Sequence, residues 1–237
     1  MQRLRNTLLP LLVLVLSLGA CGDDPTGPEP PPEFPPADGT FSQAEIDYYV
    51  EIALGSELGN ASRRVRKWEG EVVLEVRGDP GEADRAELER VVADLNDLLA
   101  EPEVRIAGPG EGGQAVIHFA PESTFEEIDS RYVPVNLGFV WITWDGADRI
   151  RTGLVMVDNT DRIDQATRNH LIREEVTQMM GLLQDSQRFP GSIFFGSFRP
   201  APTEYLPIDR AVLRMHGDPR VQRGMTETEL RFLLPTL

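Results

Sequence analysis

The spacing of hydrophobic positions predicts three main helices. Ser42 and Glu45 form a capping-box pattern, and the apolar residues that follow recur at helical spacing, so the first helix is expected to run to about Gly55. The same spacing predicts helices over residues 86–99 and about 164–182. Two shorter helices are expected near residues 208–215 and from residue 226 onward.

Short apolar runs rich in β-branched and aromatic residues predict the strands. Turn-forming or polar residues separate these runs, which cover residues 72–76, 104–107, 116–119, 139–144 and 154–157. The order along the chain is strand, helix, several strands and then a helix, which predicts an α+β fold. The basic run from Arg63 to Lys67 is interpreted as a solvated connector between the first helix and this body.

The first twenty residues have the pattern of an export signal. Arg3 and Arg5 precede an apolar run over residues 8–18, which is only about half the length that spans a bilayer. The sequence Leu-Gly-Ala-Cys over residues 18–21 resembles the bacterial lipobox, in which the cysteine becomes the lipidated first residue of the mature chain. Cys21 is the only cysteine, so no intrachain disulfide can form. We therefore expect cleavage after residue 20 and attachment to a membrane through lipidated Cys21.

Composition separates a tether from a folded body. Residues 21–40 are rich in proline and acidic residues, which predicts an extended spacer. The chain has 23 basic and 39 acidic side chains, and the signal removes two of the basic ones, so nucleic acid is not expected as a partner. The residues after position 40 are numerous enough to form one domain with a hydrophobic core. We expect an N-terminal helix and connector over 41–62 and the main domain over 63–237.

Residues 174–184 have the spacing of the metzincin zinc-peptidase motif. In that motif three histidines bind zinc, a glutamate acts as general base, and a glycine turns the chain toward the third histidine. The resemblance puts Glu175 at the position of the general base and Gly181 at the position of the glycine. The polar residues at the three histidine positions are Glu174, Gln178 and Gln184.

Downstream residues extend this resemblance. Phe194 takes the place of the methionine in the turn beneath the metal, and residues 206–217 resemble the helix that closes a matrixin domain. The wider pattern also resembles a family of bacterial envelope proteins of unassigned function with a peptidase-like fold. The resemblance covers about residues 68–217 and implies a zincin-like fold. Such a fold has a mixed twisted sheet with a backing helix, an active-site-type helix and a small helical C-terminal part.

The residues at the ligand positions argue against a metal cofactor. Neutral glutamine is a poor ligand for zinc, so no zinc is expected. An oxygen-rich set that includes Asp185 could attract calcium, but hydrogen-bonded polar residues on an ordinary helix are the preferred interpretation. His170 and Glu174 are four residues apart and are expected to form a surface pair. His118 is expected in the core of its strand.

These observations favour a binding protein of the cell envelope. We expect a lipid-anchored protein, on the outer membrane or the periplasmic face in a cell with two membranes, whose degenerate site does not catalyse. Its expected partner is an extended peptide or an envelope protein, held near the edge strand over residues 139–144. Two alternatives stay open: an active hydrolase that uses Glu175 as general base with an atypical metal site, and a structural envelope component.

Overall fold

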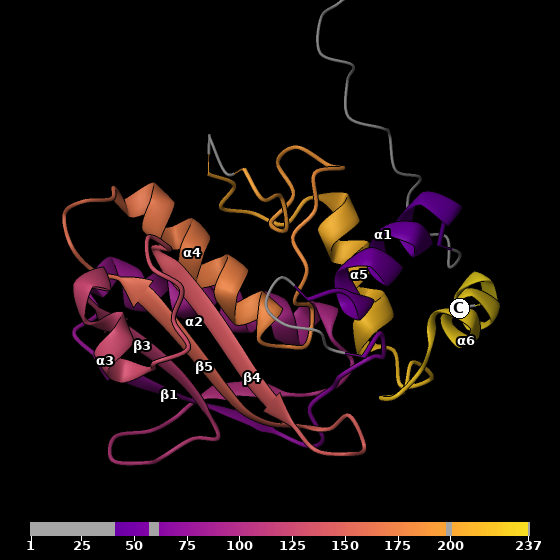
Figure 1. Ribbon diagram of the computed structural model, residues 1–237, viewed down its shortest axis with the longest axis horizontal. Helices are drawn as coiled ribbons and strands as arrows, with labels where there is room; N and C mark the ends of the chain where they lie inside the picture. The colour runs from indigo at the N-terminus through magenta and orange to yellow at the C-terminus, as the bar shows by residue number, and fades with distance from the viewer. Residues whose placement is uncertain (1–40, 57–61, 198–200, 237) are drawn as a thin grey trace, which may run out of the picture. The chain divides into compact units, whose positions relative to one another are not determined.

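The computed structural model describes residues 41–56, 62–197 and 201–236 (Figure 1). The expected signal peptide, Cys21 and the tether lie outside these residues. Within the part that is described, none of the helices has both the length and the apolar character needed to cross a bilayer.

One mixed sheet organises the described residues. Its strands are β1 (Val72–Gly78), β2 (Val104–Ile106), β3 (Ala115–Ala120), β4 (Gly138–Trp144) and β5 (Ile150–Asp158). They lie in the order β2-β1-β3-β5-β4 and form a five-stranded sheet within the described part of the chain. β1 is parallel to β2 and β3, and β3 is parallel to β5, whereas β4 runs antiparallel to β5. The fold is therefore α+β with a mostly parallel sheet, and its antiparallel strand β4 is at one edge.

Two long helices cover one face of this sheet. α2 (Glu82–Leu98) connects β1 to β2, and α4 (Gln165–Gln178) follows β5 and packs against both α2 and the β4–β5 pair (Figure 1). Arg173 of α4 is fully buried between the helices, where it pairs with Glu87 at 3.1 Å and Asp94 at 2.6 Å. The α4 helix is thus fixed by packing on one side and by ion pairs on the other.

Three further helices pack together beside the sheet. α1 (Gln43–Leu54) contacts α5 (Pro207–Gly217) and α6 (Glu227–Leu233), and a 3-10 turn over Leu234–Thr236 follows α6. The capping box that was predicted for the first helix is present, because Ser42 and Glu45 exchange hydrogen bonds between side chain and backbone. The tyrosines and aliphatic residues of α1 join the main core.

The other face of the sheet carries a small second cluster. A 3-10 turn (Glu122–Thr124) and α3 (Phe125–Ile128) lead into a loop that covers part of β4 and β5. Aromatic rings dominate the cluster, which consists of Ala120, Phe125, Tyr132, Phe139 and Met156. The hydrophobic pattern predicted no helix in this segment. His118, which was expected in the core, is only half-buried on this face.

The basic run after α1 is solvated only in its first part: Arg63 and Arg64 are exposed, but the prediction is wrong for Arg66 and Lys67, which are buried. Lys67 is 8% exposed, and its ammonium group donates to the carbonyls of Val221 at 2.8 Å and Asp218 at 3.3 Å. Arg66 is 1% exposed, and its guanidinium group lies 4.2 Å above the ring of Trp144. Backbone carbonyls and an aromatic face compensate these charges, which a count of basic residues along the sequence does not reveal.

Candidate functional site

The motif helix α4 ends earlier than the hydrophobic pattern predicts. Asp164 caps its first turn by accepting a hydrogen bond from the backbone of Thr167 at 2.8 Å, and the helix ends at Gln178. The chain then turns at Gly181, whose φ is +111°. A Cβ atom there would lie 2.2 Å from the carbonyl oxygen of Arg66, so both the backbone conformation and the close contact require glycine.

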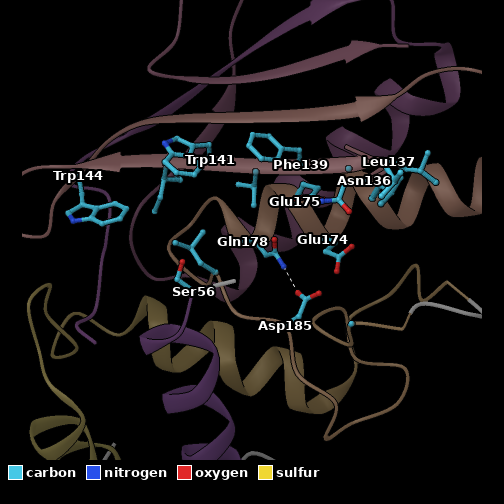
Figure 2. A pocket seen from close by; sticks show the side chains of 17 residues that line it. Ser56, Asn136, Leu137, Phe139, Trp141, Trp144, Glu174, Glu175, Gln178 and Asp185 are labelled. Atoms are coloured by element: carbon cyan, nitrogen blue, oxygen red, sulfur yellow. Dashed lines mark hydrogen bonds between the residues drawn. The ribbon is translucent and has the colours of Figure 1, made fainter. Parts of the chain in front are cut away.

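After this turn the chain returns beside α4 and completes a cavity. The cavity has a volume of about 270 Å³ and lies between the edge strand β4, the helix α4 and the segment after Gly181 (Figure 2). β4 and the residues before it contribute Val135 to Ile142 and Trp144. The other lining residues are Ser56, Leu171, Glu174, Glu175, Gln178, Leu183, Asp185 and Gly196.

The edge strand presents main-chain groups along this cavity. The backbone N–H of Asp158 donates to the carbonyl of Leu137 at 2.9 Å, one residue beyond Gly138 and Val157, which stand opposite each other at the start of the β4–β5 register. In an antiparallel pair, hydrogen-bonded positions alternate with positions whose N–H and C=O face outward. The backbone groups of Gly138, Val140 and Ile142 therefore face the open edge of the described sheet.

Glu175 occupies the space that the missing side chain of Gly138 leaves. A Cβ atom on Gly138 would lie 2.3 Å from Glu175 Oε1 and 3.0 Å from Leu171 Cδ2, both on α4. The Glu175 side chain is 7% exposed and lines the cavity. The general-base position of the motif thus lies directly against the edge strand.

Glu174 and His170 form a buried pair, so the prediction of a surface pair is wrong. His170 is fully buried and Glu174 is 6% exposed, because α4 turns this side toward the segment that precedes α5. His170 Nδ1 lies 2.8 Å from the carbonyl of Pro202, and Nε2 lies 3.1 Å from Glu174 Oε2. A carbonyl can only accept, so Nδ1 is the donor in the contact with Pro202.

The two glutamines of the motif behave differently. The side-chain amide of Gln178 lines the cavity and donates to Asp185 Oδ1 at 2.7 Å (Figure 2). Gln184 donates to the backbone carbonyl of Asp185 at 2.9 Å, but it packs against Gly55 and is not among the residues that line this cavity. The structure therefore brings Glu174, Glu175 and Gln178 together with Asp185, and it leaves Gln184 outside.

Almost the whole described part of the chain matches one protein family. Residues 43–236 match the family described as "Protein of unknown function (DUF2927)". The chain belongs to this family. The match to the DUF2927 family begins in α1 and ends in the turn after α6, so it includes every residue that lines the cavity. A search of curated proteins found no match.

Beneath the motif of this DUF2927 chain, a buried carboxylate holds the turn that contains Phe194. Asp209 of α5 accepts hydrogen bonds from Ser192 Oγ at 2.6 Å and from the backbone of Ile193 at 3.2 Å and Leu206 at 2.9 Å. Burial raises the pKa of Asp209 to about 6. Phe194 is fully buried. Sequence reasoning missed Asp209, although Pro207 at the start of α5 and an acidic residue in its first turn are helix-start signals.

The donor set does not fit zinc. Among the described residues, no group of three or more histidine, cysteine, aspartate or glutamate side chains is arranged to hold a metal ion. The amide of Gln178 presents its nitrogen to Asp185, and amide nitrogen is no zinc ligand.

Proposed function

We propose that the chain is a lipid-anchored protein of the cell envelope whose zincin-like domain binds an extended polypeptide without cleaving it. Three features support a zincin-like domain: an antiparallel edge strand on a mostly parallel sheet, a motif helix beside it, and a glycine turn after that helix. The buried turn around Phe194, packed in the main core, agrees with this proposal.

The outward-facing backbone of β4 is the observation that carries the proposed binding. Gly138, Val140 and Ile142 present N–H and C=O groups along a cavity, and an added strand would pair with these groups. Apolar side chains stand at both ends of the strand: Val135 is 83% exposed and Trp144 is 37% exposed. An extended segment could therefore gain main-chain hydrogen bonds and apolar contacts at once.

The contacts of the motif residues support binding without catalysis. Glu174 faces His170, and the amide of Gln178 is held by Asp185, so the ligand positions of the motif are used for contacts within the protein. The mature chain would be held at the membrane by lipids on Cys21, and residues 21–40 would be the spacer. Replacing Cys21 with alanine should move the protein from the membrane fraction to the soluble fraction of cells.

Proline at position 140 tests the binding mode. The N–H of Val140 faces outward, so Val140→Pro should remove one donor for an added strand and leave the hydrogen bonds to β5 intact. The matched control Val140→Ala removes the side chain and keeps the N–H. Peptides would be selected from a displayed random library against the full chain in detergent, synthesised, and measured by calorimetry.

The expected result is that Val140→Pro weakens binding of the selected peptides by about tenfold or more, whereas Val140→Ala has a smaller effect. Both variants should unfold cooperatively at temperatures close to that of the wild type. Equal affinity of Val140→Pro and wild type would show that the peptides do not add to β4. Recovery of no specific peptide would favour a purely structural role.

A further inference from the structure

The register of β4 fixes where a bound strand would place its side chains. Gly138 faces the open edge with its backbone, so one ligand residue would stand directly opposite it. Side chains of residues that stand opposite each other lie on the same face of a sheet, with Cβ positions about 4.5–5.5 Å apart. At Gly138 this is the α4 face, because a Cβ atom there would point at Glu175 and Leu171. This step rests on the proposed function.

We infer that Glu175 selects a lysine or arginine at the ligand position that pairs with Gly138. Glu175 Oε1 lies 2.3 Å from the point where a Cβ on Gly138 would be, which puts the carboxylate within reach of a long ligand side chain from the opposite strand. Because position 138 has no side chain, the Glu175 carboxylate fills that space itself and lies next to the residue that would stand opposite Gly138. Leu171 beside it offers an apolar surface to the methylene groups of such a side chain.

The charges around the cavity favour a cationic side chain. Glu174, Glu175 and Asp185 contribute carboxylates to the wall, and there is no lysine or arginine among the described residues that line it. Of these three carboxylates, Glu175 is the one whose oxygen lies against Gly138 of the edge strand. Because Glu175 is 7% exposed, water and salt screen its charge only weakly. An acidic ligand residue at this position would be repelled.

The test compares ligand residues at one position. Peptides selected on the full chain would be resynthesised with lysine, acetyl-lysine or glutamate at each position in turn. In the wild type, one position should lose about tenfold or more in affinity when lysine is acetylated, because the charged partner of a poorly screened carboxylate is removed. This measurement needs no variant protein, so it stands even if a substitution at Glu175 impairs folding.

Glu175→Gln should reduce that preference for lysine over acetyl-lysine to less than about threefold, since the amide keeps the shape and removes the charge. The matched control Glu89→Gln changes the net charge equally at an exposed site on α2 and should leave the preference unchanged. An unchanged preference in Glu175→Gln, or enrichment of apolar or acidic residues at the position, would overturn this inference. If the Glu175 test gives that result but Val140→Pro still weakens peptide binding, only the proposed role of Glu175 is wrong. If Val140→Pro also leaves binding unchanged, the proposed addition of a strand to β4 is wrong.

Discussion

The buried carboxylate of Asp209 should make folding stability depend on pH in an unusual direction. Its pKa is raised from 3.8 to about 6 by burial, although Ser192 and two backbone N–H groups donate to it. The folded state therefore binds a proton more tightly than the unfolded state between these two values. The stabilisation is fully present below pH 3.8 and is lost as the pH rises through about 6.

The size of this effect follows from the difference in proton affinity. At about 1.4 kcal/mol per tenfold change, the raised pKa makes the folded state roughly 3 kcal/mol less stable at neutral pH than below pH 3.8. Asp209→Asn cannot ionise and can still accept from the two N–H groups, while its amide can donate to Ser192. The free energy of unfolding of the wild type relative to Asp209→Asn should thus fall by roughly 2–3 kcal/mol between pH 4 and pH 7.

Urea denaturation of both proteins across this pH range measures that difference. The comparison between variants is essential because burial lowers the pKa of His216 to about 3, which makes stability fall as the pH drops below 6.5. The contribution of His216 is common to both proteins and cancels. A difference that stays constant from pH 4 to pH 7 would refute the reasoning. Asp209→Ala should lose about 3 kcal/mol or more at every pH, because three donors lose their acceptor.

Three other outcomes are expected. Gly181→Ala should lower the free energy of unfolding, measured by thermal denaturation, by more than about 3 kcal/mol. The control Gly70→Ala also has a positive φ, +79°, but no atom lies within 4 Å of the new Cβ, so it should lower the free energy of unfolding by only about 1 kcal/mol. Equal losses would contradict the close contact at residue 181. Arg173→Met should lower the free energy of unfolding by about 3–5 kcal/mol because it leaves Glu87 buried without this partner. Adding Glu87→Gln to this variant should restore part of the lost stability. A double variant no more stable than Arg173→Met would contradict this ion-pair explanation. Elemental analysis of protein purified without chelators or a histidine tag should find no stoichiometric zinc or calcium, and bound metal that is lost in Glu174→Ala would contradict the proposed metal-free cavity.

Local signals in the sequence predicted most of the helices and strands. The capping box at Ser42 starts α1, and Asp164 starts α4, because these interactions involve residues three apart. Strands β1, β3 and β4 each lie within two residues of the apolar runs that predicted them. Helix α4 ends early because Gly181 adopts a positive φ against Arg66, a contact between residues far apart in the sequence.

The candidate site could be predicted only in part. Spacing along α4 brought Glu174, Glu175 and Gln178 together, since helical geometry decides their positions. The cavity also depends on β4, which reaches α4 through its antiparallel pairing with β5. No local sequence pattern predicts that β4 pairs with β5 or that Gln184 lies outside the cavity. Asp209 was missed for a related reason, because its importance comes from burial against Ser192 and Ile193.

The contacts of the motif residues show which groups of this chain are the partners of the polar side chains in the cavity wall. A buried polar group is costly unless it has a partner, and a metal ion would supply one for several groups together. Here Glu174 has His170 one helical turn earlier, and Gln178 has Asp185 beyond the glycine turn. Each of these two partners comes from this chain. The spacing of the motif is then kept by the packing of α4 against β4, where Gly138 gives Glu175 its space.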